Sequence, residues 1–264
     1  MNDMINRKFT YAIIALLTLG ITGCSQDDDL TPPVDGKQEL RIATRSTDGA
    51  GNTTETFTRP FVLELWYGNR KETFQMTYTE GSGWNTVKSS YPLPVTAFAY
   101  CGKGVADVTS PYDYNVDLEL DQTDSDKLMA ADVMIATGKA QAGVPLDLVF
   151  EHYFSKMTFN VTYEGFTNAP TLTEIKSNGI SCFLNGDKIE MIMRPGDYIA
   201  GMEILSLKVN GVTQSVRLKE NTEIVKGTHY TYNLKIGTKE ATLTATNVGY
   251  PGGWGDSDSE TELN

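Results

Sequence analysis

The chain has 264 residues, and its 34 acidic residues outnumber its 22 basic ones, which gives a net charge of -12. Such a composition excludes nucleic acid and anionic lipid as main partners, because both are bound through clustered lysine and arginine. With three cysteines and two histidines, the chain also has too few of these residues for a disulfide framework or a structural zinc cluster.

The first 23 residues have the features of a bacterial export signal. Arg7 and Lys8 precede an apolar stretch from Phe9 to Leu19, and small residues follow before Cys24. This stretch is about half of the roughly 20 residues that span a bilayer as a helix. We therefore expect residues 1–23 to be a cleaved signal peptide and not a permanent anchor.

The residues at the predicted cleavage point, Ile21-Thr22-Gly23-Cys24, resemble the lipobox of bacterial lipoproteins. The resemblance implies a lipid on Cys24, and two or three acyl chains hold a protein firmly because each buried CH₂ contributes about 0.8 kcal/mol. The alternative is an ordinary signal peptide followed by an unrelated cysteine. The acidic stretch Ser25–Asp29 resembles the surface-export signal of Bacteroidetes lipoproteins, or it is a solvated part of a tether over residues 24–37.

Alternation of apolar and polar residues predicts β-strands through the first half of the chain. The first runs over residues 38–45 with Leu40, Ile42 and Thr44 on one face, and a flexible loop from Ser46 to Thr56 follows it. Further strands are predicted at 61–67, 73–78, 95–100, 114–120, 144–150 and 156–163. Ser125 to Thr137 is the best candidate for a helix, with Ser125 as its N-cap and Gly138 as its end.

Short strands separated by turn residues continue through the second half. They are predicted at 172–175, 180–184, 188–193, 203–209, 214–218, 229–236 and 241–248. The pair Asn210-Gly211 predicts a tight hairpin, and the tail that follows Val248 is expected to be flexible.

The polar stretch from Glu164 to Pro170 predicts a domain boundary, with an N-terminal domain at 38–166 and a C-terminal domain at 167–264. Strands at roughly ten-residue spacing favour antiparallel sandwiches. The predicted fold class is therefore all-β, with two tandem antiparallel β-sandwich domains and at most one or two short helices.

The sequence contains no recognised catalytic, nucleotide-binding or metal-binding motif. His152 and His229 lack a third ligand at motif spacing, and Cys101 and Cys182 are predicted to be small core residues. The acidic stretch from Asp117 to Asp126 lacks the spacing of a calcium loop and is expected to be a solvated face. We predict no enzymatic activity, no cofactor and no metal. A pair of carboxylates for glycosidic cleavage is defined by its separation in space, and no feature of the sequence singles one out.

Two segments, 131–137 and 144–161, resemble the fimbrillin family of Bacteroidetes lipoproteins. They carry the family's short Asp-x-Met-x-Ala segment, an apolar strand, a histidine and a Ser-Lys pair, here Asp132, Met134, Ala136, His152, Ser155 and Lys156. The run 227–246 and Trp254 are similar to the family's last strands. The resemblance implies two transthyretin-like domains, a surface-exposed lipoprotein of the cell outer membrane, and assembly into a fimbrium with other fimbrillin-type subunits by strand donation.

The resemblance also implies where the chain matures. In the family an arginine-directed protease removes the N-terminal strand together with its lipid, and Arg45 matches the place of that cut. Arg41 and Arg59 are weaker candidates. The alternative is that Arg45 is a surface charge and the strand stays, as in anchor subunits that remain lipidated.

The last predicted strand has an alternating set of apolar residues that suits donation to a neighbouring subunit: Ala241, Leu243, Ala245 and Val248. The alternative is that these residues form the last core strand of their own domain.

A second functional hypothesis is a stand-alone surface lipoprotein that binds glycan or another host or bacterial surface ligand. Its expected sign is a flat, exposed aromatic cluster drawn from Trp66, Trp84, Tyr91, Tyr112 and Tyr114.

Overall fold

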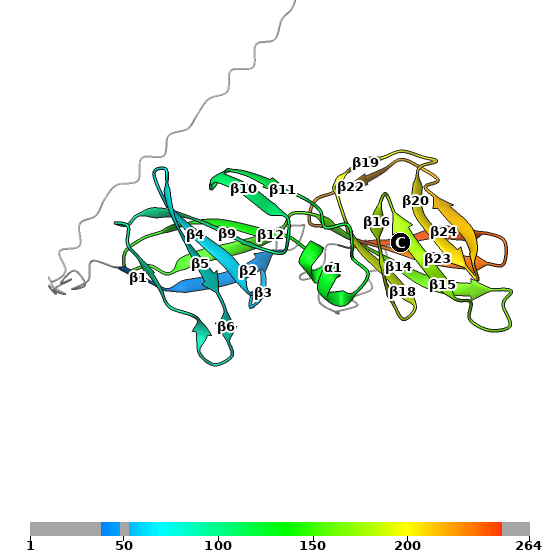
Figure 1. Ribbon diagram of the computed structural model, residues 1–264, viewed down its shortest axis with the longest axis horizontal. Coiled ribbons are helices and arrows are strands. Elements are labelled where there is room, and N and C mark those ends of the chain that lie inside the picture. The colour runs from blue at the N-terminus through cyan, green and yellow to red at the C-terminus, as the bar shows by residue number, and fades with distance from the viewer. Residues whose placement is uncertain (1–37, 48–52, 250–264) are drawn as a thin grey trace, which may run out of the picture.

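The computed structural model describes residues 38–47 and 53–249. Two β-rich halves lie one after the other along the long axis, and one short helix, α1 (Ser125–Ala131), lies near their junction (Figure 1). The predicted all-β sandwich class is confirmed. The predictions for the signal peptide, Cys24, the tether and the tail with Trp254 fall outside the described residues.

The first half is built on a seven-stranded sheet of order β3-β2-β13-β12-β9-β4-β5. These strands are β2 (Ile42–Thr47), β3 (Thr53–Thr56), β4 (Phe61–Tyr67), β5 (Arg70–Met76), β9 (Val95–Cys101), β12 (Met134–Ala140) and β13 (Leu146–His152). Alternate residues of the central strands, such as Leu63, Ala99 and Leu148, are fully buried in one core. The alternation in the sequence therefore reflects a sheet with one face on this core.

Three short two-stranded ribbons complete the first half: β1 (Gln38–Leu40) with β8 (Val87–Ser89), β6 (Tyr78–Thr79) with β7 (Gly83–Trp84), and β10 (Val105–Ser110) with β11 (Asp113–Val116). The β10–β11 ribbon covers the second face of the large sheet, where Tyr114 packs on Phe98 with ring centroids 4.8 Å apart. The sequence does not predict β10. The strand predicted at 114–120 is β11, which ends at Val116.

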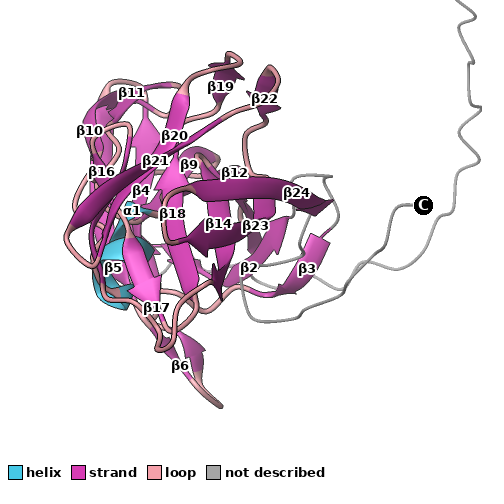
Figure 2. Ribbon diagram, turned by 90° about the vertical axis from the view of Figure 1, so that its right-hand side faces the viewer, coloured by secondary structure: helices cyan, strands magenta, loops and turns pink. Residues whose placement is uncertain are grey.

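The second half is a sandwich of a five-stranded sheet, order β17-β18-β14-β23-β24, and a four-stranded sheet, order β16-β15-β20-β21. Figure 2 shows β14, β23 and β24 side by side, with β20 and β21 in a separate layer. Their bounds, with those of the β19–β22 ribbon, are β14 (Ser155–Glu164), β15 (Leu172–Ser177), β16 (Ile180–Ser181), β17 (Phe183–Asn185), β18 (Lys188–Met193), β19 (Gly196–Tyr198), β20 (Glu203–Val209), β21 (Val212–Arg217), β22 (Thr222–Ile224), β23 (His229–Gly237) and β24 (Ala241–Gly249).

The hairpin predicted at Asn210-Gly211 is confirmed. It joins β20 to β21, and both turn residues have positive φ, 50° and 84°. A two-residue turn with two positive φ angles has the twist that paired strands need, which is why Asn-Gly is favoured there.

The sequence predicts β14 in the N-terminal domain, but the strand lies in the second half. It pairs antiparallel with β18 and parallel with β23, so it belongs to the second half although it precedes the predicted boundary at residue 166. The chain passes between the halves at Tyr153 and Phe154, and the stretch 165–171 is a loop within the second half. Polar composition identifies an exposed loop, but it does not identify the sheet to which the strands beside that loop belong. From the pairing of β14 we propose domains at 38–154 and 155–249.

The helix is shorter than the predicted span from Ser125 to Thr137. Its N-cap is Asp124, whose carboxylate accepts a hydrogen bond from the backbone N–H of Lys127 at 2.9 Å. It ends at Ala131, and Met134–Ala140 forms β12. A short apolar run suits either a helix or a strand, and pairing with β9 decides the matter here.

The sheets are not purely antiparallel, because β2 pairs with β13 in parallel, as β14 does with β23. The predicted strand 38–45 is divided into β1 and β2 at Arg41, and β2 continues to Thr47. The predicted loop 46–56 therefore contains the end of β2 and all of β3.

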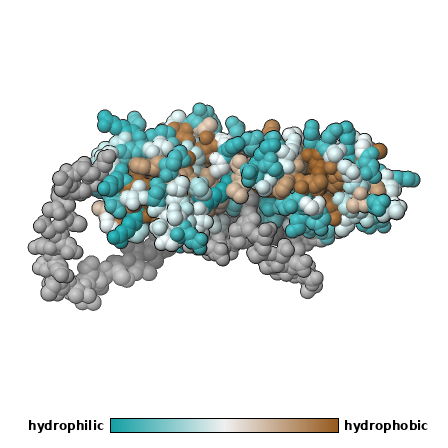
Figure 3. All heavy atoms as spheres, turned by 60° about the horizontal axis from the view of Figure 1, so that its bottom comes forward, coloured by the Kyte–Doolittle hydropathy of each residue, from teal (hydrophilic) through white to brown (hydrophobic). Residues whose placement is uncertain are grey.

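The two halves share one buried core around their junction. Trp66, Phe98 and Ile135 of the first half belong to the same cluster as Met191 and Leu205 of the second half. The face shown in Figure 3 is mainly hydrophilic, with apolar areas on both halves and the larger one on the second half. In the described part of the chain no helix is long and apolar enough to cross a membrane, and no group of three metal-ligating side chains occurs.

Candidate functional site

The N-terminal strand lies in a slot between two neighbours in the large sheet. β2 pairs in parallel with β13 from Ile42 opposite Leu146 to Ser46 opposite Phe150, and it pairs with β3 on its other side. The backbone N–H of Leu146 also donates to the carbonyl of Arg41 at 2.7 Å. Removing residues 38–45 would expose the β13 edge from Leu146 to Val149, because Ile42–Arg45 of β2 cover it.

The inward side chains of this strand fill an apolar groove. Leu40 is buried and Ile42 is half-buried, and both belong to the core that contains Leu148 and Phe150. Each buried aliphatic side chain is worth about 1.5 to 3 kcal/mol relative to an exposed one. The strand is therefore held by apolar contacts in addition to its backbone hydrogen bonds.

Thr44 is the polar member of the same inward row. It is 4% exposed, and its Oγ1 donates to the carbonyl of Phe57 at 2.6 Å and accepts from Trp84 Nε1 at 3.0 Å. The alternation placed Thr44 on the inner face, but the sequence did not predict these partners, because they lie 13 and 40 residues away along the chain.

Arg45 points away from the groove and pairs with Asp147 on β13, and its Nε donates to Asp147 Oδ1 at 3.3 Å. The two side chains are about half exposed, 46% and 49%. Because β2 continues to Thr47, the bond after Arg45 lies inside a paired strand and not at its end. A protease would therefore need this part of β2 to separate from its neighbours before cutting, and Arg45 stays a predicted maturation site.

The two other candidate arginines differ in their surroundings. Arg41 is exposed at the break between β1 and β2. Arg59 is 20% exposed, and its guanidinium donates to the Asp132 carboxylate at 2.7 Å and to the carbonyls of Met129 and Asp132 at 2.5 and 2.8 Å. Arg59 therefore has a structural role that a cut would disrupt.

The predicted donor strand is β24, which lies at the edge of the five-stranded sheet. It pairs antiparallel with β23 from Ala241 opposite Ile236 to Gly249 opposite His229. Ala241 and Leu243 are half-buried against the core, whereas the side chains of Ala245 and Val248 are outside those described. The strand completes its own sheet here, so donation would require it to leave β23.

The residues of the family-like motif gather at the junction of the halves. Asp132 and His152 are buried, with 2.7 Å between Asp132 Oδ1 and His152 Nδ1. Ser155 Oγ donates to the carbonyl of Val225 at 2.7 Å, and the Lys156 ammonium lies 2.7 Å from Glu190 Oε1. These residues fasten the crossing between β13 and β14, and Met134 and Ala136 fill the core of the first half.

Burial raises the pKa of the Asp132 carboxyl, but the neighbouring His152 and Arg59 lower it by more, and the net result is a pKa below the ordinary value. Burial raises the pKa of the Cys101 thiol to about 11 and that of Cys182 to about 12. Both cysteines are buried and free, as predicted. Their thiols are protonated at neutral pH and form part of the core.

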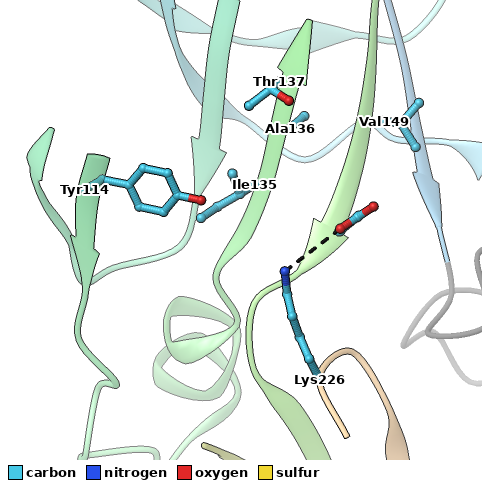
Figure 4. A pocket seen from close by; sticks show the side chains of 7 residues that line it. Tyr114, Ile135, Ala136, Thr137, Val149 and Lys226 are labelled. Carbon is cyan, nitrogen blue, oxygen red and sulfur yellow. Dashed lines mark ion pairs between the residues drawn. The ribbon is translucent and has the colours of Figure 1, made fainter. Parts of the chain in front are cut away.

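A pocket lies where the halves meet, lined by residues of both. Figure 4 shows Tyr114, Ile135 and Thr137 on its first-half side and Lys226 from the second half. The Lys226 ammonium lies 3.9 Å from Glu151 Oε2, and both side chains are more than half exposed.

The aromatic residues predicted to bind glycan do not form one flat, exposed cluster. Trp66 is 7% exposed, Trp84 is half-buried and bonded to Thr44, and Tyr91 is half-buried and stacks on Tyr67. Tyr112 is 77% exposed, and Tyr114 is the member that lines the pocket.

Comparison with known proteins identifies relatives of this chain. The sequence profile of a family described as fimbrillin-like matches residues 46–249. A search of curated proteins found no match.

Solved structures with a similar fold come from Bacteroides and Porphyromonas species. A cell adhesion protein from Bacteroides ovatus is 13% identical with a TM-score of 0.54, over 81% of this chain and 98% of that one. A cell adhesion protein from Bacteroides uniformis is 18% identical with a TM-score of 0.49, over 83% and 99%. The tip fimbrial protein Mfa3 from Porphyromonas gingivalis is 9% identical with a TM-score of 0.45, over 81% and 100%.

Proposed function

Because this chain belongs to the fimbrillin-like family, we propose that it is a pilus subunit with a role in adhesion. In this proposal it is exported as a lipoprotein through Cys24, reaches the cell outer membrane, and joins other fimbrillin-type subunits in a fimbrium by strand donation. It is a structural protein and not an enzyme. Its role in a fibre would be that of a stalk, tip or anchor subunit.

The observation that carries this proposal is the position of the N-terminal strand. Residues 38–45 precede the part of the chain that matches the family. Leu40 pairs opposite Val87 of β8, whereas Ile42–Arg45 cover the β13 edge, and Leu40, Ile42 and Thr44 face inward. A sheet that loses such a strand exposes unpaired backbone groups and apolar pockets, which favours the binding of another strand.

Maturation in this proposal is a cut after Arg45 by an arginine-directed protease. The cut would separate the lipid on Cys24 and the groove-filling residues from the rest of the subunit. A strand from a different neighbouring subunit would then fill the vacated position, and the strand with Ala241, Leu243, Ala245 and Val248 is the one that this chain would itself donate to another subunit. Several buried aliphatic side chains at about 1.5 to 3 kcal/mol each would make the joint durable.

The test is mass spectrometry of the protein isolated from its native envelope, for the wild type and for Arg45→Ala. We expect wild-type fimbriae to contain a chain that begins at Ser46, and Arg45→Ala to accumulate with acylated Cys24 and to be lost from the polymer. Arg70→Ala is the matched control, because Arg70 is an exposed arginine at the tip of the β4–β5 hairpin. Acylated Cys24 in every wild-type molecule would contradict assembly by strand removal.

A further inference from the structure

The N-terminal strand contributes one buried hydroxyl to its groove, and this hydroxyl is bonded twice. Thr44 Oγ1 donates to the Phe57 carbonyl at 2.6 Å and accepts from the Trp84 indole N–H at 3.0 Å. The inward residues before it, Leu40 and Ile42, pack against apolar side chains. The inward row is therefore aliphatic, aliphatic and hydroxyl at alternate positions.

Both partners of the hydroxyl belong to the part of the chain that would remain after a cut at Arg45, and aromatic packing fixes both. Phe57 stacks on Phe150 with ring centroids 4.1 Å apart, and Trp84 packs edge-on against Phe61 at 4.7 Å. When residues 38–45 leave, the indole N–H and the carbonyl stay in the groove. A strand that covers them with an apolar side chain would leave a donor and an acceptor buried without partners, which is costly.

One atom that both donates and accepts satisfies this site, and among short side chains a hydroxyl does so. Resting on the proposed function, we propose that the groove selects a donor strand with the pattern aliphatic-x-aliphatic-x-Thr or Ser, whose first aliphatic position pairs with β8 and whose other two positions run parallel to β13. Thr44 thus marks the position that determines specificity, and the hydroxyl-binding pair is Trp84 and Phe57.

The chain's own last strand does not have this pattern. Its two alternating rows supply five triplets, of which two end on valine or glycine in place of a hydroxyl: Thr244, Thr246 and Val248; Ala245, Asn247 and Gly249. The other three are, in order: Ala241, Leu243 and Ala245; Leu243, Ala245 and Asn247; Thr242, Thr244 and Thr246. The first ends on a methyl group, the second ends on a larger amide, and the third places threonine where Leu40 is buried. The groove therefore takes a strand from a different subunit and not from a second copy of this chain.

The experiment uses the whole mature chain, nicked after Arg45 with an arginine-directed protease and checked by mass spectrometry. Fluorescent peptides with the sequence Gln38–Arg45 are exchanged into the groove in mild urea, and incorporation is followed by anisotropy. The variants are Thr44→Ser, Thr44→Val and, as a matched control on the exposed face, Ala43→Val. A peptide with the sequence Ala241–Gly249 represents a second copy.

We expect the unchanged, Thr44→Ser and Ala43→Val peptides to bind alike, and the Thr44→Val peptide to bind about tenfold more weakly, because valine leaves the indole and the carbonyl unpaired. The Ala241–Gly249 peptide should bind at least as weakly as the Thr44→Val peptide. Equal binding of the Thr44→Val peptide, or tight binding of the Ala241–Gly249 peptide, overturns the specificity proposal alone. Failure of the unchanged peptide to enter at all contradicts a removable strand and with it the proposed function.

A second measurement does not depend on exchange. In the intact chain, Thr44→Val should lower the equilibrium constant for folding about tenfold relative to Thr44→Ser, measured by urea unfolding. Equal stability of the two variants would show that Trp84 and Phe57 do not require the hydroxyl.

Discussion

At the scale of single residues, the junction depends on a buried charge cluster that the sequence did not predict. His152 and Asp132 were recognised as part of a motif, but their contact joins residues 20 positions apart, and Arg59 comes from 73 positions away. Alternation in a sequence indicates which residues point inward. It does not indicate which distant polar groups meet there.

Asp132→Asn should destabilise the protein by about 3 to 5 kcal/mol at pH 7, because it leaves the Arg59 guanidinium partly buried without its anion. The measurement is urea unfolding followed by circular dichroism. The control is Asp147→Asn, which removes a half-exposed pair with Arg45 and should cost no more than about 1 kcal/mol. Equal effects of the two substitutions would contradict a stabilising role for the buried cluster.

The same carboxyl predicts a pH dependence. The pKa of Asp132 is lowered in the folded state, so its stabilising contribution is complete above the unfolded pKa of about 3.9 and is lost as the pH falls through the lower folded value. We expect the free energy of unfolding of the wild type to fall as the pH drops below about 4. The fall should be smaller in Asp132→Asn, because the variant lacks this titrating carboxyl. Parallel pH profiles for the two proteins would be the contrary result.

At the scale of elements, local patterns in the sequence predict most strands but not which strands pair with each other in a sheet. The hairpin at Asn210-Gly211 follows from turn chemistry alone, whereas the parallel pairing of β2 with β13 joins segments about a hundred residues apart. The sequence does not predict β10 because three of its six residues are polar, Asp107, Thr109 and Ser110, and no residue of the strand is fully buried. Pairing partners, and therefore the domain to which β14 belongs, depend on contacts that no local window contains.

The β10–β11 ribbon offers a test of backbone packing. Gly104 has a φ of 101°, and a Cβ at this position would lie 1.9 Å from the carbonyl oxygen of Asp117, so Gly104→Ala must displace the ribbon. We expect a loss of at least about 2 kcal/mol in unfolding free energy. Gly179→Ala is the matched control, because its φ of 85° is similar but its Cβ would meet nothing within 4 Å. A similar loss in both variants would show that φ strain alone is responsible.

At the scale of the whole molecule, the two halves are joined by more than the chain. Gln122 is fully buried, and its side chain bonds both backbone groups of Ile192 on β18, accepting from the N–H at 2.7 Å and donating to the carbonyl at 2.9 Å. The same segment pairs with Ser181, whose N–H donates to the carbonyl of Leu120 at 2.8 Å. A segment of the first half thus supplies hydrogen bonds to two strands of the second.

Gln122→Ala should lower the stability by about 2 to 3 kcal/mol, because both backbone groups of Ile192 lose their partner. Calorimetry should show one transition for the wild type and a separation of the two halves in the variant. Gln75→Ala, on the exposed face of β5, is the control and should behave as the wild type. Two transitions already present in the wild type would contradict coupled halves.

The hydrogen bonds between the Gln122 side chain and the backbone of Ile192 have a mechanical consequence for a subunit in a fibre. One neighbour would pull on the first half, through the strand beside β13, and the next neighbour would pull on the second half. The junction between the halves would therefore carry the force. Within residues 53–249 the chain crosses there once, between β13 and β14, and a single covalent crossing would act as a hinge. With Gln122 and Leu120 bonded across the joint, several hydrogen bonds share the pull and must break together, so the subunit would resist stretching as one stiff rod.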